Sequence, residues 1–296
     1  MLFPGSSDYV GRHAGELVLR KPLWRRLLPA VPILLIVSLL AWPFLEPIFP
    51  EVEQVTLVSA DLPAEIGELR VVYVSDIHGY SADRLVQRIN ALNADLVLLG
   101  GDYATDSQSA VEFFRSLPRI SARYGVYAVM GNHDRTLPES NLAELQTAMQ
   151  LAGVTPLVNA AVPVRIGNRS VWVVGIDDVT GGHPDLTAVA KQVQKSDYVI
   201  FLCHSPAIIP QSLEMRDASG SYGWFDLGLF GHTHGGQIGL FGGIVRDSSV
   251  PAEYRSGWSR VNRIDLLTSR GYGTTGLPIR ILCRPQIHVI TIQSAD

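Results

Sequence analysis

Five apolar segments of this 296-residue chain each run directly into a short polar cluster that could bind metal ions or transfer protons. Carboxylates, imidazoles and an amide oxygen together suit divalent metals such as Mn, Fe, Zn or Co. In chain order the clusters are Asp76-Ile77-His78, Gly101-Asp102, Gly131-Asn132-His133-Asp134, Cys203-His204-Ser205-Pro206 and Gly231-His232-Thr233-His234. The pattern indicates a metal site assembled from distant parts of the sequence.

Each of these clusters, taken alone, has an ordinary structural explanation. A histidine after a strand is more often a surface or core residue than a ligand, and a Gly-Asp or Gly-Asn pair usually marks a turn. The set is different, because a purely structural account must explain why buried strands repeatedly end in ionisable groups, which are costly to bury unpaired. We therefore interpret the five clusters as one functional site.

A continuous apolar, β-rich run stands in front of each cluster, and a further run lies between the third and fourth clusters. They predict buried strands at residues 70–75, 95–100, 125–130, 170–175, 197–202 and 226–230. Between the first two, Leu85, Ile89 and Leu92 recur at helical spacing, which predicts a strand–helix–strand unit. Gly167-Asn168, between two alternating apolar runs, predicts a hairpin.

These elements predict a mixed α/β domain over residues 65–296. The hydrophobic content of 47% allows a sizeable core. We expect two packed mixed β-sheets flanked by helices. Because ligand sites in open α/β sheets lie at the carboxyl ends of the strands, the five polar clusters would converge on one crevice.

An uncharged apolar stretch precedes this domain, at residues 27–45. Its length is close to the about 20 residues that cross a bilayer core as a helix, although three prolines in it can shorten or kink such a helix. It predicts a transmembrane anchor, with a cleaved signal peptide or an interfacial helix as the alternative. The expected division is residues 1–26 as a cytoplasmic segment, 27–45 as the anchor, 46–64 as a juxtamembrane linker and 65–296 as the α/β domain.

Charged residues on the two sides of the anchor predict its orientation. Basic residues precede it and acidic residues follow it, namely Arg20, Lys21, Arg25 and Arg26, then Glu46, Glu51 and Glu53. The positive-inside rule then keeps the N-terminus in the cytoplasm and places the α/β domain on the outer side.

The overall charge argues against nucleic acid as a partner. The formal net charge is −4, so there is no global basic field to bind nucleic acid by counterion release. The two cysteines, Cys203 and Cys283, lie far apart and form neither a zinc pattern nor a disulfide framework. Cys203 is expected to be a buried free thiol. The oligomeric state stays open.

At the five clusters the sequence resembles the calcineurin-like metallophosphoesterase superfamily. The motif series of that superfamily, D-x-H, G-D, G-N-H-D/E, a separate H and G-H-x-H, stands in order over residues 76–234. The segments at residues 231–238 and 269–285 are similar to its membrane-anchored or exported bacterial branch. The resemblance implies a two-sheet metallophosphoesterase fold and a place in the bacterial inner membrane.

The resemblance also implies roles for individual residues. Two divalent metal ions would be held, one by Asp76, His78 and His234, the other by Asn132, His204 and His232, with Asp102 bridging both. His133 would be the catalytic histidine outside the ligand shell. Asp134 would orient His133, since the working tautomer of a histidine depends on what its other nitrogen bonds.

The implied activity is hydrolysis of phosphodiester or pyrophosphate bonds at the membrane. Some members of the branch cleave UDP-2,3-diacylglucosamine in lipid A synthesis, which makes this nucleotide-lipid the most specific candidate substrate. Two alternatives stay open. One is an exported phosphodiesterase that acts on nucleotides or envelope phosphoesters, and the other is a catalytically silent, metal-bound binding module.

Further residues could contact substrate. Arginines pair well with phosphate, but a structural ion pair is the more ordinary role. Two tyrosines could line the cleft or pack in the core. These residues are Arg135, Arg270, Arg280 and Arg284, and Tyr103 and Tyr272.

Overall fold

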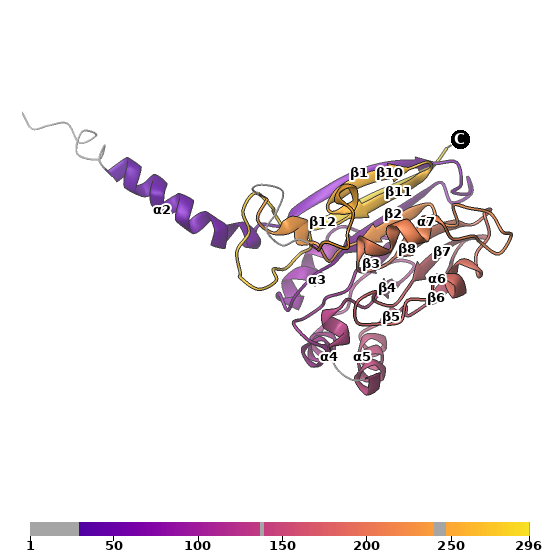
Figure 1. Cartoon of the computed structure of the whole chain (residues 1–296), viewed down its shortest axis with the longest axis horizontal. Helices are drawn as coiled ribbons and strands as arrows, with labels where there is room; N and C mark the ends of the chain where they lie inside the picture. Colours follow the sequence, from indigo (N-terminus) through magenta and orange to yellow (C-terminus); the bar gives the residue numbers. More distant parts are fainter. Residues whose placement is uncertain (1–29, 137–138, 240–246, 296) are drawn as a thin grey trace, which may run out of the picture. The chain divides into compact units, whose positions relative to one another are not determined.

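The computed structural model describes residues 30–136, 139–239 and 247–295. They contain two six-stranded mixed β-sheets with helices packed against them, which confirms the predicted fold class (Figure 1). The predicted strands are all present, within a few residues of the predicted bounds.

The first sheet has the strand order β1-β12-β2-β3-β4-β5. Its strands are β1 (Glu51–Ser59), β12 (Gln286–Ser294), β2 (Glu68–Val74), β3 (Leu96–Leu99), β4 (Val126–Ala128) and β5 (Val154–Pro156). From β2 to β5 the strands are parallel. The three crossovers run through α3 (Ala82–Asn90), α4 (Ser107–Ser116) and α5 (Glu139–Leu151). The carboxyl ends of β2, β3 and β4 therefore meet at one edge.

The second sheet has the order β10-β11-β9-β8-β7-β6. Its strands are β10 (Gly257–Val261), β11 (Ile264–Thr268), β9 (Leu227–Phe230), β8 (Tyr198–Leu202), β7 (Arg169–Gly175) and β6 (Ala160–Ile166). The four central strands are parallel and the two outer strands are antiparallel to their neighbours. The predicted hairpin joins β6 to β7, and Gly167 in its turn has a φ of 60°.

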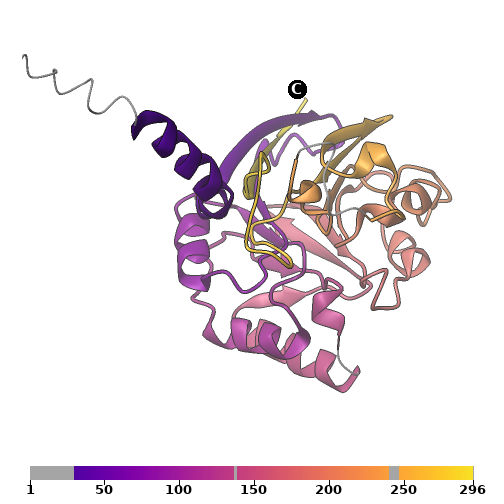
Figure 2. The same cartoon turned by 60° about the vertical axis from the view of Figure 1, so that its left-hand side comes forward.

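Three buried apolar clusters fill the space between the layers. One cluster lies between the sheets and includes Leu98 and Val173. A second packs α3, α4 and α5 on the first sheet, and a third packs α6 (Leu186–Ala190) and α7 (Ile209–Leu213) on the second sheet. Figure 2 shows the purple and magenta helices on one side of the sheets and the salmon and orange ones on the other. Sheets covered on both faces require the continuous apolar strands seen in the sequence.

The helix α3 has the buried apolar face that the helical spacing of its apolar residues predicts. The hydroxyl of Ser81 caps its first turn by accepting from the backbone of Arg84, and such capping satisfies a donor that the helix leaves free. Leu85, Val86 and Ile89 face the sheet and are buried. The predicted strand–helix–strand unit is confirmed.

The first sheet extends into the segment that the sequence suggested as a linker, residues 46–64. β1 lies in this segment and pairs in parallel with β12 along its whole length, from Glu51 opposite Gln286 to Ser59 opposite Ser294. Its side chains alternate between half-buried and exposed.

The apolar N-terminal stretch is helical where the structure describes it. α2 spans Ala30–Leu45 with Pro43 inside it, and Val31–Ile48 has a mean hydropathy of 2.0 over 18 residues. By length and composition this segment can cross a membrane. Residues 1–29, which include the predicted cytoplasmic segment, lie outside the described residues. The chain divides into two compact units after Ala41.

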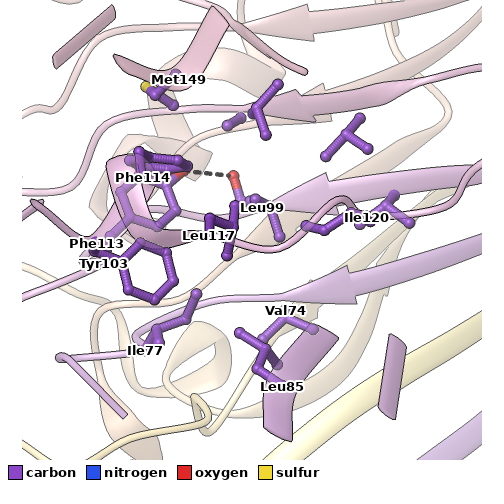
Figure 3. Close-up of a cluster of buried hydrophobic side chains, with 14 of the residues drawn as sticks. Val74, Ile77, Leu85, Leu99, Tyr103, Phe113, Phe114, Leu117, Ile120 and Met149 are labelled. Carbon is purple, nitrogen blue, oxygen red and sulfur yellow. Dashed lines mark hydrogen bonds between the residues drawn. The ribbon is translucent and has the colours of Figure 1, made fainter. Parts of the chain in front are cut away.

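Figure 3 shows the core beneath α4, where Tyr103 packs against Phe113 and Phe114. The ring of Tyr103 meets that of Phe114 edge to face at a centroid distance of 4.6 Å. Its hydroxyl donates to the carbonyl of Val129 at 2.6 Å. Of the two roles considered for Tyr103, the structure shows the packing role.

Replacing Phe114 by alanine should lower the free energy of unfolding by about 3–5 kcal/mol, because the side chain is buried and its loss leaves a cavity. Urea unfolding of the detergent-solubilised chain, followed by circular dichroism, measures this. Leu151→Ala is the control, since Leu151 is 84% exposed and its loss should change stability by less than about 0.5 kcal/mol. Equal stability of the two variants would contradict the described packing.

Candidate metal centre

The five predicted clusters do lie at strand ends. Val74 ends β2 two residues before Asp76, and Leu99 ends β3 three residues before Asp102. Asn132 follows β4 in the same sheet, while His204 and His232 follow β8 and β9 in the other sheet. Both sheets therefore contribute side chains to one site.

The backbone at these positions adopts a conformation that is rare outside glycine. Five of the seven predicted ligands have a positive φ, namely Asp76 (53°), His78 (48°), Asp102 (56°), His232 (69°) and His234 (51°). Such residues cost free energy and persist only where the surrounding structure holds them. The carbonyl of Asp102 accepts from the backbone of both Ile77 and His78, at 2.8 and 3.0 Å, and so holds the first two loops together.

The first predicted ligand group converges on a small volume. The Nε2 atoms of His78 and His234 are 2.9 Å apart. Asp76 Oδ1 lies 3.5 Å from His234 Nε2, and Asp102 Oδ2 lies 3.7 Å from His78 Nε2. The possible ligand atoms of Asp76, His78 and His234 all lie within 4.8 Å of one another.

The surroundings of His204 show whether a cation fits among the predicted ligands. Its Nδ1 lies 2.7 Å from the carbonyl of Gly100. A carbonyl only accepts, so Nδ1 carries the hydrogen, and Nε2 is the nitrogen left to bind a cation or a proton. That buried Nε2 has no hydrogen-bond partner among the described residues, and it faces Asp102 Oδ2 at 3.2 Å and Asp76 Oδ1 at 3.9 Å. Lone pairs and carboxylates that face one another suit a bound metal ion.

The remaining predicted ligands form a third contact at the same site. His232 Nδ1 lies 2.9 Å from Asn132 Oδ1, so the two atoms that could bind a metal lie side by side. The rings of His204 and His232 are 5.2 Å apart between centroids. The structure therefore brings all seven predicted ligands together.

Asp247 is a site residue that the sequence reasoning missed. Its Oδ2 lies 3.1 Å from His232 Nε2, and it lines the cavity of about 400 Å³ beside the ligands. An Nε2–H bonded to this carboxylate leaves the Nδ1 lone pair of His232 for the metal side. Asp247 follows no apolar strand, so no pattern singled it out.

Asp134 has a different role from the one predicted. Its carboxylate accepts backbone N–H groups from Gly131 and Asp102 at 2.8 Å and from Tyr103 at 3.1 Å. The ring nitrogen Nδ1 of His133 instead lies 2.9 Å from the carbonyl of Thr105. Asp134 thus holds two ligand loops together, and Thr105 orients His133.

Glycine is required where these two loops meet. A methyl group on Gly131 would overlap the carboxylate and backbone of Asp102, and one on Gly101 would lie 2.6 Å from the nitrogen of Gly131. Gly101 also has a φ of 90°. The close approach of the loops therefore excludes any side chain at either position.

Burial and neighbouring charges shift the pKa values of the cluster. Burial opposes ionisation of Asp102, but His204 and His78 hold its pKa below the usual range. Burial also opposes protonation of His204, yet Asp102 raises its pKa well above the ordinary value. The position of His204 Nε2 therefore favours positive charge. For His234, burial lowers the pKa to about 3, which keeps the imidazole in the neutral form that can bind a metal.

Three of the four arginines considered as phosphate ligands have structural partners. Arg135 pairs with Asp177 at 2.7 Å in a buried position. Arg280 is fully buried and donates to backbone carbonyls, including those of Gly273 and Cys283. Arg284 donates to the carbonyl of Phe49.

Arg270 is the fourth of these arginines. No hydrogen bond or ion pair of its guanidinium is found among the described residues. A methyl on Gly235 would lie 2.8 Å from Arg270 Cγ, so this side chain passes over the residue that follows His234. Of the two roles considered for Arg270, phosphate binding or a structural ion pair, the described residues show neither.

Comparison with known proteins identifies the family. A sequence profile of the calcineurin-like phosphoesterases matches residues 69–236, which is more than half of the chain and includes all five clusters. The chain belongs to this family. It is a metal-dependent phosphoester hydrolase with an α/β metallophosphoesterase fold.

Several relatives carry related names. The chain is 28% identical to the uncharacterized metallophosphoesterase YkoQ of Bacillus subtilis, over 76% of this chain and 84% of the relative. It is 28% identical to the phosphodiesterase YaeI of Escherichia coli, over 75% and 82%. A transmembrane protein with a metallophosphoesterase domain from Danio rerio is 31% identical over 83% of this chain and 58% of that protein.

Replacing Arg135 by methionine should lower the free energy of unfolding by about 3 kcal/mol, because it leaves the Asp177 carboxylate buried without its partner. Urea unfolding measures the change. Arg115→Met is the matched control, since Arg115 pairs with Glu144 at the exposed surface and such pairs contribute about 1 kcal/mol or less. A raised KM for substrate without any loss of stability would instead make Arg135 a phosphate ligand.

Proposed function

We propose that this chain is a membrane-attached phosphodiesterase whose active site holds two divalent metal ions. The convergence of seven ligand side chains from five strand ends carries the proposal. Asp76, His78 and His234 would hold one ion and Asn132, His204 and His232 the other, with Asp102 touching both. Such a pair of ions clamps a phosphoryl group and activates water for in-line displacement.

His133 is the residue of this chain that would move a proton. It lines the same cavity as Asn132 and Asp102. Thr105 accepts from its Nδ1 at 2.9 Å, so the tautomer is fixed and Nε2 is the nitrogen that can donate to substrate when the ring is protonated. Its backbone N–H donates to Asp102 Oδ1 at 2.9 Å, which fixes its position relative to the ligands. His133 would stabilise the phosphoryl oxygens or protonate the leaving oxygen.

Attachment to the membrane rests on two observations. The segment Val31–Ile48 is apolar and long enough to span a bilayer. A relative from Danio rerio is named a transmembrane protein with a metallophosphoesterase domain. A single pass with the catalytic domain outside a bacterial inner membrane remains the orientation that the flanking charges predict.

A phosphodiester is the substrate class that we favour. The relative YaeI is named a phosphodiesterase, and the cavity beside the ligands, at about 400 Å³, is large enough for a phosphate with two modest substituents. UDP-2,3-diacylglucosamine is the more specific candidate. Its use would require the catalytic domain to face the cytoplasm, opposite to the orientation that the charges predict.

Replacing Asp102 by asparagine, or Asn132 by alanine, should abolish hydrolysis of bis-p-nitrophenyl phosphate by the Mn²⁺-loaded chain, because each change removes a donor from the centre. Activity and bound metal, measured by mass spectrometry, are compared with those of Glu144→Gln, which changes an exposed acidic residue. UDP-2,3-diacylglucosamine is assayed in parallel. Activity close to wild type in a metal-loaded Asp102→Asn chain would disprove the assignment.

Replacing His133 by alanine should lower kcat for the same diester by about 10²–10⁴-fold, the usual contribution of a general acid. Its bound metal should stay at the wild-type level, since His133 is not among the proposed ligands. The leaving group provides a further check. A diester with a more acidic leaving group should lose less rate in this variant, and an equal loss for all leaving groups would argue against proton donation.

A further inference from the structure

Large apolar side chains are exposed on the unit that carries the metal centre, in two segments far apart in sequence. Leu277 and Leu282 are 66% and 70% exposed, and Ile48 and Phe49 are 50% and 53% exposed. Phe44 is exposed as well. Water-exposed side chains of this size, grouped on one surface, mark an interaction site.

Hydrogen bonds join the two segments and hold residues 280–283 against residues 43–46. The carboxylate of Glu46, which is only 2% exposed, accepts from the backbone of Cys283 at 2.6 Å and of Leu282 at 3.0 Å. It also accepts from the indole of Trp42 at 2.9 Å. The backbone of Arg280 donates to the carbonyl of Pro43 at 2.9 Å. We call residues 42–49 and 277–284 the apolar rim.

The apolar rim is connected to the metal centre through Gln237. The side chain of this buried residue donates to the carbonyls of Thr275 and Leu277, both at 3.0 Å, and accepts from the backbone of Thr275. Gln237 lies three residues after His234, and Thr275 lines the cavity with His234. Leu277 is two residues beyond Thr275, so their Cα atoms are at most about 7 Å apart. The exposed leucine therefore lies near the mouth of the cavity.

The surroundings of the rim favour lipid as its occupant. The first part of the rim overlaps the end of the apolar segment Val31–Ile48, which can span a bilayer. Trp42 is half exposed, and the exposed Arg284 donates to the carbonyl of Phe49. Tryptophan and arginine beside apolar residues are typical of the zone where a membrane meets water.

We propose that the apolar rim lies in the headgroup region of the bilayer and presents the phosphoester of a lipid to the metal centre. This inference rests on the proposed phosphodiesterase function. A lipid-binding rim beside the cavity explains why a chain with a segment that can span a membrane also exposes leucines near the other end of its sequence. Lipid phosphodiesters would then be preferred over soluble ones.

Site-specific fluorescence tests the contact with lipid. The full chain is reconstituted in phosphatidylcholine vesicles with some phosphatidylglycerol, carrying Leu277→Cys or Leu282→Cys labelled with an environment-sensitive dye. Both native cysteines are buried, so labelling is selective. Leu151→Cys, at an exposed position on α5, is the matched control. Spin-labelled lipids should quench the dye at positions 277 and 282 and not at 151. Quenching no stronger than at 151 would overturn the proposal, whatever the activity.

Kinetics test the presentation of lipid. Phosphatidyl-p-nitrophenol in vesicles and bis-p-nitrophenyl phosphate in solution release the same leaving group. The double variant Leu277→Ser/Leu282→Ser should lower the ratio of the vesicle rate to the soluble rate about tenfold, equivalent to about 1.4 kcal/mol. Leu151→Ser should leave the ratio unchanged. An unchanged ratio in the double variant, or no lipid cleavage by the wild type, would overturn the proposal. If the metal-loaded wild type cleaves neither substrate, the phosphodiesterase function is refuted. The quenching experiment would still show whether the rim contacts lipid.

Discussion

The structure depends on a buried cluster of carboxylates and imidazoles whose arrangement favours positive charge between them. Asp76 and Asp102 are both buried, and the imidazoles of His78, His204 and His234 direct ring nitrogens toward them. Buried carboxylates that share a site repel each other unless positive charge lies between them. A divalent ion among these atoms converts the repulsion into attraction. The rest of the fold is arranged to hold the groups in place.

Hydrogen bonds to the backbone and the close approach of loops, rather than side-chain packing, hold the carboxylates and imidazoles in place. Asp134 collects three N–H groups from two loops, and glycines let the loops approach until a methyl group would not fit. The two sheets contribute to the same centre from opposite sides of their shared apolar core. These interactions compensate the free-energy cost of the positive φ values. The predicted ligands can therefore be held in place before metal binds.

Much of this could be predicted from sequence, because the strands are covered on both faces and are continuously apolar. The carboxyl ends of parallel strands meet at one edge of a sheet, so the residue types predicted a metal site there. The assignment of individual ligands came from the resemblance to the metallophosphoesterases. The pairing of β1 with β12 could not be predicted. Glu51 to Ser59 alternate without a clear apolar face, and their partner lies more than 200 residues away. Asp247 and the buried position of Arg280 were also missed, since both depend on loops whose path is set by tertiary contacts.

The most direct test of this account is anomalous diffraction from crystals of the Mn²⁺-loaded chain. We predict two anomalous peaks, one beside Asp76, His78 and His234 and the other beside Asn132, His204 and His232, with Asp102 in contact with both. A single peak, or peaks elsewhere with these side chains bonded only to one another, would contradict the two-metal centre.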